Sequence, residues 1–146
     1  MSPSEKVKYI SNWIKSYVDK MPTKAESLVI GISGGIDSSV SSTLSAMTGL
    51  KTIVLSMPIK QIDHQHDLSL KHQDWLVKKF NNVQAHTISL DKLFESFSST
   101  LSKFDNEHGF ANSRARLRMT TLYQVAAANK GLSLIHISEP TRPRLI

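Results

Sequence analysis

The chain has 146 residues, enough for one domain with a buried core, and its 40% hydrophobic and 21% charged composition is that of a globular protein. It contains no cysteine, which excludes disulfides, zinc–thiolate sites and a cysteine nucleophile. The net charge of +6 is scattered along the sequence, so charge alone does not distinguish a nucleic-acid partner from phosphate-bearing small molecules.

The N-terminal stretch is typical of a helix rather than of a targeting segment. Ser4 can cap a helix from Glu5 to about Lys20, because apolar residues recur there at helical spacing. The stretch lacks the apolar core of a signal peptide, and no run reaches transmembrane length. We therefore expect a cytoplasmic protein with no membrane partner.

A buried strand and a glycine-rich turn follow. Leu28 to Ile32 are apolar and partly β-branched, as in a parallel strand covered on both faces. The sequence Ser33-Gly34-Gly35-Ile36-Asp37-Ser38 then leads into a helix that ends near Met47. The two glycines allow close backbone approach to a ligand, and a helix start favours phosphate. The simpler interpretation is an ordinary strand-to-helix turn rich in Ser and Gly.

The rest of the chain continues the alternation of strands and helices. Further strands are expected at Thr52–Ser56 and Ala85–Leu90, and further helices at Asp67–Phe80, after a cap at Asp91, and at Phe110–Asn129. The segment from Lys60 to Asp67 is expected to be a polar loop. Three aromatic residues on helices are expected in the core, namely Trp13, Trp75 and Tyr123. The alternation predicts an α/β fold with a doubly wound parallel sheet, whose ligands bind beyond the carboxyl ends of the strands.

The end of the sequence differs from the rest. Residues 1–132 are expected to form the domain, truncated after about three strands. Residues 133–146 resemble the translation of a sequencing-adapter read-through and are expected to be a non-native tail. Leu134 to Ile137 is still apolar enough to form a strand at a vacant sheet edge. The alternative is a genuine terminal strand followed by a proline-rich tail.

The last predicted helix carries an arginine motif, Asn112-Ser113-Arg114-Ala115-Arg116-Leu117-Arg118-Met119. At about 100° per residue, Asn112 and Arg116 share one face, and Arg114 and Arg118 share roughly the opposite one. Arginine suits phosphate and carboxylate oxygens because its planar fork binds them in pairs. The simpler interpretation is a solvated basic face.

Two motifs together resemble a known family. No lysine follows the glycines, so the loop is not a Walker A motif. Ser33-Gly34-Gly35-Ile36-Asp37-Ser38 is instead similar to the pyrophosphate-binding loop of the ATP pyrophosphatases, the PP-loop superfamily. Together with Asn112-x-x-Ala-Arg-x-Arg-Met119 it resembles ammonia-dependent NAD synthetase, over roughly the N-terminal half of that family's domain.

The resemblance implies an adenine-nucleotide α-hydrolase-like fold and a two-step ligation. The nicotinate carboxylate of deamido-NAD would attack ATP and release pyrophosphate, and ammonia would then displace AMP. The residues that the resemblance assigns to ATP are Gly31, Ile32, Ser33, Gly34, Gly35, Ile36, Asp37, Ser38 and Gln61. Asp37 would also bind Mg²⁺, and deamido-NAD would meet Arg118, Arg116 and Asn112.

The family is expected to be homodimeric. Because the match ends near Leu132, where that family continues, this chain is expected to bind ATP weakly at best and not to complete the ligation. The chain offers no glutaminase cysteine, so free ammonia is the expected nitrogen source.

Other interpretations remain open at this stage. A different PP-loop enzyme, of the tRNA-thiolating or GMP-synthetase-like kind, would share the loop. A non-catalytic nucleotide- or RNA-binding module would fit the positive charge. His64, His66 and Asp67 resemble a metal site, although a His-x-His pair in a polar loop is more often simply solvated.

Overall fold

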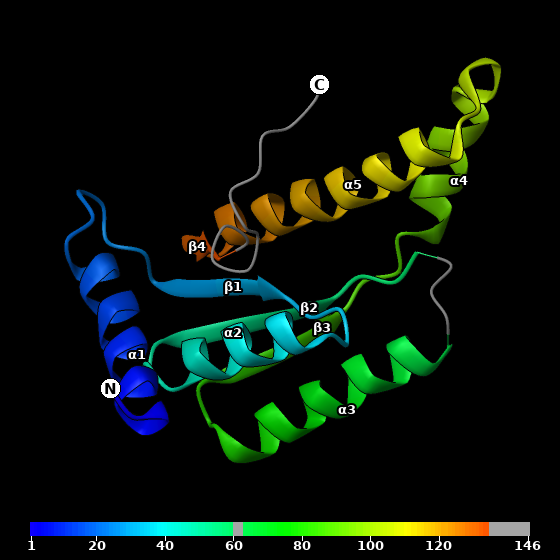
Figure 1. Cartoon of the computed structure of the whole chain (residues 1–146). Helices are drawn as coiled ribbons and strands as arrows, with labels where there is room; N and C mark the ends of the chain where they lie inside the picture. The colour runs from blue at the N-terminus through cyan, green and yellow to red at the C-terminus, as the bar shows by residue number, and fades with distance from the viewer. Residues whose placement is uncertain (60–62, 135–146) are drawn as a thin grey trace.

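Four parallel strands form one sheet with the order β3-β2-β1-β4 (Figure 1). We describe it from a computed structural model, which covers residues 1–59 and 63–134. The strands are β1 (Ser27–Gly31), β2 (Lys51–Ser56), β3 (Val83–Thr87) and β4 (Gly131–Ser133). This arrangement confirms the α/β fold with a parallel sheet.

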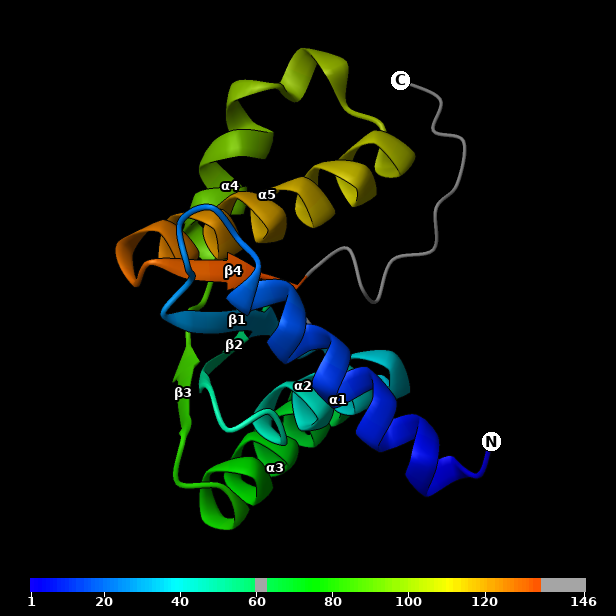
Figure 2. The ribbon, with the colours of Figure 1, turned by 90° about the vertical axis from the view of Figure 1, so that its left-hand side faces the viewer.

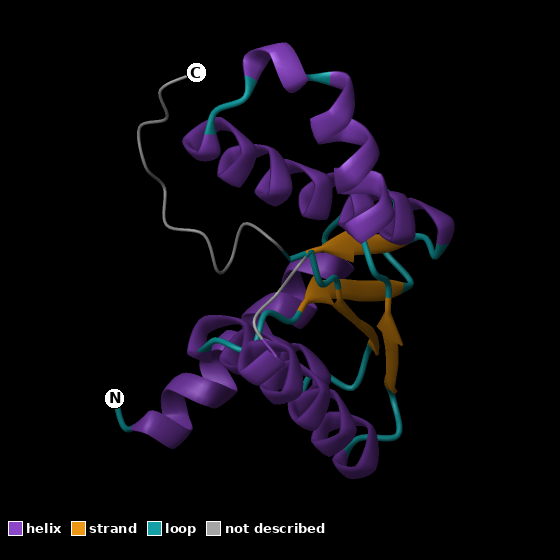
Figure 3. Cartoon of the chain, turned by 90° about the vertical axis from the view of Figure 1, so that its right-hand side faces the viewer, coloured by secondary structure: helices purple, strands orange, loops and turns teal. Residues whose placement is uncertain are grey.

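Helices cover both faces of the sheet (Figures 2 and 3). One face carries α1 (Pro3–Asp19), α2 (Ile36–Ala46) and α3 (Asp63–Lys79). The other face carries α4 (Asp91–Thr100) and α5 (Glu107–Ala128), joined through a 3₁₀ turn at Ser102–Phe104. Among the described residues, no helix is both long and apolar enough to cross a membrane.

The alternation of side chains along β1 divides the core into two clusters. Leu28 and Ile30 pack with Leu76 of α3 on one face, whereas Val29 packs with Leu122 of α5 on the other. All five side chains are almost fully buried, and each such burial stabilises the fold by about 1.5–3 kcal/mol. Strand β1 therefore holds both helical layers together.

Helix α2 packs against the sheet although it is rich in serine. The side chains of Ser42 and Ser45 are completely buried. The Ser42 hydroxyl donates to the Ser39 carbonyl at 3.1 Å, and the Ser45 hydroxyl donates to the Ser41 carbonyl at 2.7 Å. Because their donors are satisfied within the helix, these small side chains are buried without leaving an unpaired hydroxyl proton.

Two predicted helix caps are wrong by one or two residues. Helix α1 is capped by Ser2, not Ser4: the Glu5 N–H donates to Ser2 Oγ at 3.2 Å and the Glu5 carboxylate accepts from the Ser2 N–H at 3.0 Å. Pro3 explains the shift, because proline fits the first helical position and lacks an N–H. Asp91 is the first residue of α4, and Leu90 occupies the cap position.

The expected count of three strands is also wrong. Helix α5 leads into β4, which pairs with β1 through the register Ser27 to Gly131 and Val29 to Ser133. The next residue, Leu134, is buried and its N–H donates to the Val29 carbonyl at 3.0 Å. The predicted strand at Leu134–Ile137 therefore begins earlier. Residues 135–146 lie outside the described residues, so the division of the chain at residue 132 stays a prediction.

The three aromatic residues expected in the core lie at the surface. Trp13 is 51% exposed, Trp75 43% and Tyr123 44%. On α1 the inward positions are filled by Ile14 and Val18, which leaves Trp13 to stack on Tyr17 with ring centroids 5.6 Å apart. An apolar helix position predicts contact with the core only when it lies at the centre of the buried face.

Candidate functional site

The loop after β1 runs directly against the start of α3 (Figure 1). Gly34 has a φ of +90°, and a Cβ at this position would lie 2.5 Å from the Gln65 carbonyl oxygen. Glycine is therefore required at Gly34 for both its conformation and its space. Gly31, at the end of β1, is confined as well, because a Cβ there would lie 3.0 Å from Met57 Cε.

Serine hydroxyls hold the loop in shape. Ser38 Oγ accepts from the Ser33 N–H at 3.1 Å, and it lies 3.2 Å from Ser33 Oγ. The Gly35 N–H donates to Ser33 Oγ at 3.3 Å, and the Ser39 hydroxyl donates to the Gly35 carbonyl at 2.9 Å. A hydroxyl can rotate, so the same groups can donate to an anion that enters the loop.

Helix α2 begins at this loop with Gly35 as its cap, and no side chain caps it. The first-turn N–H groups of such a helix attract an anion, since they lack carbonyl partners in the helix. Asp37 stands exposed on this first turn, beside the exposed side chain of Ile36. Ile32 differs from its neighbours: its side chain is buried and its N–H donates to the Leu55 carbonyl at 2.7 Å.

Arg118 reaches the same end of the sheet from α5. Its Nε donates to the Met57 carbonyl at 3.0 Å, just beyond the end of β2. Burial lowers the pKa of Arg118 from its usual value, and the positive charge of Arg114 lowers it further. A guanidinium stays charged at neutral pH despite such a shift. Leu122, one turn later, lies within 3.6 Å of where a Cβ on Gly31 would be, so α5 is held beside the loop.

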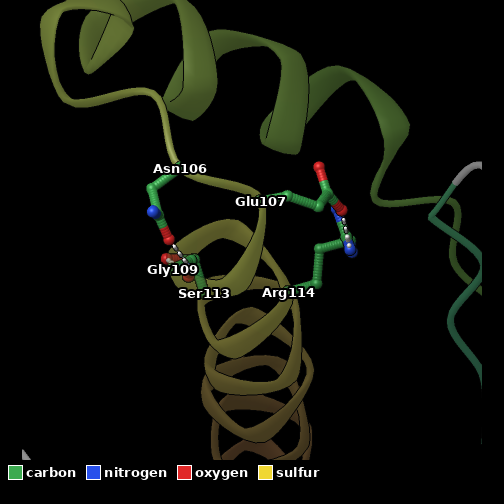
Figure 4. A network of polar contacts seen from close by, with 5 residues as sticks. All are labelled: Asn106, Glu107, Gly109, Ser113 and Arg114. Carbon is green, nitrogen blue, oxygen red and sulfur yellow. Dashed lines mark hydrogen bonds and ion pairs between the residues drawn. The ribbon is translucent and has the colours of Figure 1, made fainter.

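The other arginines of the motif lie elsewhere. Arg114 pairs with Glu107 at 3.0 Å across the start of α5 (Figure 4), and its guanidinium carbon lies 5.2 Å from the Phe94 ring centroid. Arg114 therefore ties α5 to α4. Within the described part of the chain, the exposed side chains of Arg116 and Asn112 make no hydrogen bond or ion pair.

The start of α5 is fixed by a second contact in the same region. Asn106 caps the helix, because its Oδ1 accepts from the Gly109 N–H at 2.8 Å, and the Ser113 hydroxyl donates to the Gly109 carbonyl at 3.0 Å (Figure 4). The structure therefore brings Arg118 to the carboxyl end of β2, holds Arg114 against Glu107 and Phe94, and leaves Arg116 and Asn112 exposed.

Two predicted features fall partly outside the described residues. Gln61 lies outside them, as does the side chain of His64. Helix α3 begins at Asp63, so the expected polar loop is shorter than predicted and His66 and Asp67 are helical. His66 Nδ1 is buried without a hydrogen-bond partner among the described residues, and those residues contain no group of three potential metal ligands.

Sequence reasoning missed the groups that hold the site together. The Met57 carbonyl fixes Arg118, and the Ser69 hydroxyl donates to Ser56 Oγ at 2.7 Å, which ties α3 to the end of β2. Both serines are almost fully buried. A backbone carbonyl leaves no signal in a sequence, and a lone Ser on a helix does not indicate its partner.

Comparisons with known proteins all indicate one family. A family model described as NAD synthase matches residues 6–137. The NH(3)-dependent NAD(+) synthetase of Mesoplasma florum is 37% identical over 139 residues, which are 92% of this chain and 54% of that protein.

Two solved structures have the same fold. NMN synthetase from Francisella tularensis superposes with a TM-score of 0.81 at 34% identity, covering 91% of this chain and 53% of that one. The NH3-dependent NAD synthetase from Campylobacter jejuni superposes with a TM-score of 0.78 at 26% identity, covering 91% and 56%. The chain thus spans about half the length of the relatives it matches.

Proposed function

Because the chain belongs to the NAD synthase family, we propose that it forms the ATP-binding part of an enzyme that amidates deamido-NAD with ammonia. The observation that supports this most strongly is the position of Arg118. A cationic side chain that can bind a carboxylate or phosphate lies at the same sheet end as the Gly34 loop. A site that joins an acid to ATP requires both parts close together.

The proposed reaction has two steps. An oxygen of the nicotinate carboxylate attacks the α-phosphorus of ATP, and the bond to the β-phosphate breaks to release pyrophosphate. Ammonia then attacks the carbonyl carbon of the adenylated intermediate, AMP leaves with the bonding electron pair, and a proton is lost from nitrogen. The protein contributes positioning and charge neutralisation rather than a covalent intermediate.

The proposed residue roles are those that the family's motifs suggest for this chain. Gly31 to Ser38 form the proposed site for the phosphates of ATP. Backbone N–H groups from Gly34 onward hold the phosphates, together with the hydroxyls of Ser33 and Ser38, whereas Gly31 and Ile32, whose N–H donates to the Leu55 carbonyl, fix the end of β1 beside the loop. Ile36, whose exposed side chain lies on the first turn of α2, belongs to the same proposed ATP site. Gln61 is the further ATP contact of this proposal. For deamido-NAD, Arg118 is the direct contact, and the solvent-facing Arg116 and Asn112 meet the nucleotide from the outer side of α5.

Mg²⁺ fits this set of groups. It prefers oxygen ligands and usually binds one or two carboxylates together with phosphates of the substrate. Asp37 offers one exposed carboxylate on the first turn of α2. When bound, the ion would neutralise phosphate charge, and Asp37 is the residue that would hold it.

A second candidate substrate is nicotinate mononucleotide, the smaller acid that lacks the adenylate half of deamido-NAD. The structural match to NMN synthetase from Francisella tularensis favours this candidate. Both acids carry the same reacting carboxylate, so the chemistry above is unchanged. The other PP-loop enzymes and an RNA-binding module lose support, because the family match covers most of the chain.

The test is a chimera in which residues 1–132 precede the remaining half of the Mesoplasma florum relative. Supplied with ATP, Mg²⁺ and ammonia, it should convert deamido-NAD or nicotinate mononucleotide into the amide, with AMP and pyrophosphate in equal amounts. Light scattering of the same sample tests the homodimer, and localisation of the full-length protein tests the cytoplasmic expectation. A folded chimera that binds ATP but amidates neither acid would overturn the proposal.

A further inference from the structure

Helix α1 lies on the outside of the domain (Figure 2), and its outward side carries an aromatic stripe. The members of this stripe follow one another at intervals of four residues and are 62%, 51% and 50% exposed, namely Tyr9, Trp13 and Tyr17. The buried side of the helix is filled by Ile14 and Val18, which point about 100–140° away from Trp13. Trp13 already stacks on Tyr17, with ring centroids 5.6 Å apart. The stripe therefore presents flat aromatic surface to the outside.

Two lysines extend the stripe at its ends. At about 100° per residue, Lys6 and Lys20 point within about 20° of Trp13 around the helix, and both are exposed. With a rise of 1.5 Å per residue they lie about 21 Å apart along the axis. We call the aromatic stripe and these two lysines the α1 face. Along the helix this face reads cation, three aromatic rings, cation.

The carboxylates of α1 point away from this face. Glu5 and Asp19 lie about 80° and 120° from Trp13 around the helix. Both are already engaged, because the Glu5 carboxylate accepts from the Ser2 N–H at 3.0 Å and the Asp19 carboxylate lies 3.0 Å from Lys24 Nζ. The α1 face is therefore cationic and suits an anionic partner. A second copy of this chain, which carries the same lysines and a net charge of +6, would bring like charges together.

We propose that the α1 face binds single-stranded nucleic acid, with bases stacked on the aromatic stripe and backbone phosphates at Lys6 and Lys20. Every base has a flat aromatic face, so stacking on Trp and Tyr needs no particular base sequence. Lysine contacts to phosphate add affinity that is likewise independent of sequence. The family match concerns the enzyme and does not describe this face, so the inference is independent of the proposed function and adds to it.

An anionic membrane surface is the other partner whose charge would match. Segments that recognise such surfaces usually gather about 4–8 basic residues, whereas the α1 face has only Lys6 and Lys20. Interfacial helices also bury a broad apolar side in the lipid, and the one aliphatic side chain of α1 beside the stripe is Ile10, which is 37% exposed. Separate rings with a cation at each end favour bases and phosphates over lipid.

The probe is an RNA of eight uridines, which contains no adenine and so does not resemble ATP. The chain has two tryptophans, so the Trp75→Phe variant leaves Trp13 as the only one. The RNA should quench the emission of Trp13 saturably, with a Kd of roughly 1–100 μM in 50 mM KCl. A fluorescein-labelled copy should give the same Kd by anisotropy. Two phosphate contacts predict binding about sevenfold weaker in 200 mM KCl.

Substitution of matched tryptophans tests the stacking. Trp13→Ala should weaken RNA binding at least about tenfold, whereas Trp75→Ala removes a ring that is 43% exposed on α3 and should leave the Kd unchanged. Circular dichroism checks that each variant folds, and Tyr9→Ala replaces Trp13→Ala if that variant does not. Equal effects of the substitutions on α1 and α3 would overturn the proposal.

Substitution of matched lysines tests the phosphate contacts. Lys6→Ala/Lys20→Ala should weaken binding at least about fivefold and remove most of its salt dependence. Lys8→Ala/Lys15→Ala makes the same change of charge on the same helix, but these exposed lysines point about 140–160° away from Trp13. This control should change the Kd less than about twofold. The same loss in both pairs would show a diffuse charge effect and would overturn the proposal.

Binding at another place, binding to lipid, or coverage of the α1 face by the rest of the enzyme would also overturn the proposal. Excess pyrophosphate, which has phosphates without bases, should not displace the RNA, because displacement would place the RNA in the Gly34 loop. Vesicles of phosphatidylserine and phosphatidylcholine should not shift the emission of Trp13 to the blue. The chimera described above should bind the RNA as tightly as this chain does, whether or not it amidates an acid.

Discussion

Arg118 Nε donates a 3.0 Å hydrogen bond to the Met57 carbonyl, and this bond joins α5 to the end of β2. Replacing Arg118 with lysine removes the planar fork and leaves the carbonyl without this partner. We expect Arg118→Lys to lower the free energy of unfolding by about 1 kcal/mol, measured by urea denaturation. Arg116→Lys is the control, since Arg116 is exposed and should change stability by less than about 0.5 kcal/mol. Equal losses in both variants would contradict the assigned contact.

Gly34 and Gly35 are neighbours that differ in whether they can accept a side chain. Gly34→Ala forces a Cβ to 2.5 Å from the Gln65 carbonyl oxygen at a φ of +90°, so the variant should lose about 2–4 kcal/mol of stability and its ATP binding. Gly35→Ala meets only Ser33 Oγ at 3.5 Å and should lose less than about 1 kcal/mol. Thermal unfolding of the two variants tests this difference. Similar losses of stability in both would show that the loop relaxes freely around the added Cβ.

Asp37 is expected to matter only when magnesium is present. Asp37→Asn should raise the Kd for ATP at least about tenfold in Mg²⁺, measured by calorimetry, because the carboxylate can no longer bind the ion. In EDTA the variant should match or exceed the parent, since one negative charge near the phosphates is gone. Asp67→Asn, an exposed carboxylate on α3, serves as the control. A similar loss with and without Mg²⁺ would argue against metal binding by Asp37.

His72 should make the fold sensitive to mild acid. Burial lowers the pKa of His72 below the ordinary value of 6.5, and a hydrogen bond with the Ser39 backbone opposes this effect. As the pH falls through 6.5, the unfolded chain takes up the proton first, so the free energy of unfolding decreases. One proton limits the slope to about 1.4 kcal/mol per pH unit. Denaturation of His72→Gln between pH 7.5 and 5 should show a shallower dependence than the parent, and an identical slope would contradict this.

Lys130 has a φ of 51°, in the left-handed region, just after the end of α5. Glycine adopts this conformation freely, whereas other residues lose roughly 1–2 kcal/mol there. Lys130→Gly should therefore raise the free energy of unfolding by about 1 kcal/mol. Lys130→Ala keeps the unfavourable backbone and should change little, because the exposed 3.8 Å contact of Lys130 with Glu26 contributes almost nothing. A gain in both variants would point to charge rather than conformation.

The elements that depend on short-range sequence patterns were predicted well. The apolar run before the Gly34 loop predicted β1, and helical spacing predicted α2 and α5 to within three residues at either end. The surface position of Trp75 could not be predicted, because periodicity identifies an apolar stripe without saying which of its edges is covered. The fourth strand was predicted at Leu134–Ile137, later than its observed start at Gly131, because β4 is short and gains its pairing from β1.

The arginine motif illustrates the same limit within the site. Its helical geometry predicted that Arg114 and Arg118 point together, and both do face inward. Which of them reaches the carboxyl end of β2 depends on Glu107 and Phe94, which engage Arg114, and on the Met57 carbonyl, which engages Arg118. These partners are distant in the sequence or belong to the backbone, so only the folded chain separates the two roles.

The strand order β3-β2-β1-β4 has an evolutionary consequence. After β1 the chain adds β2 and β3 on one side of β1, and it then crosses over to add β4 on the other side. The helix that follows β1 and the helix that precedes β4 therefore lie on opposite faces of the sheet. They part at the carboxyl end of β1, and this reversal opens a crevice there by topology alone. A descendant could exchange the serines of the loop or the arginines of α5 and still inherit a crevice in the same place, available for a different acid.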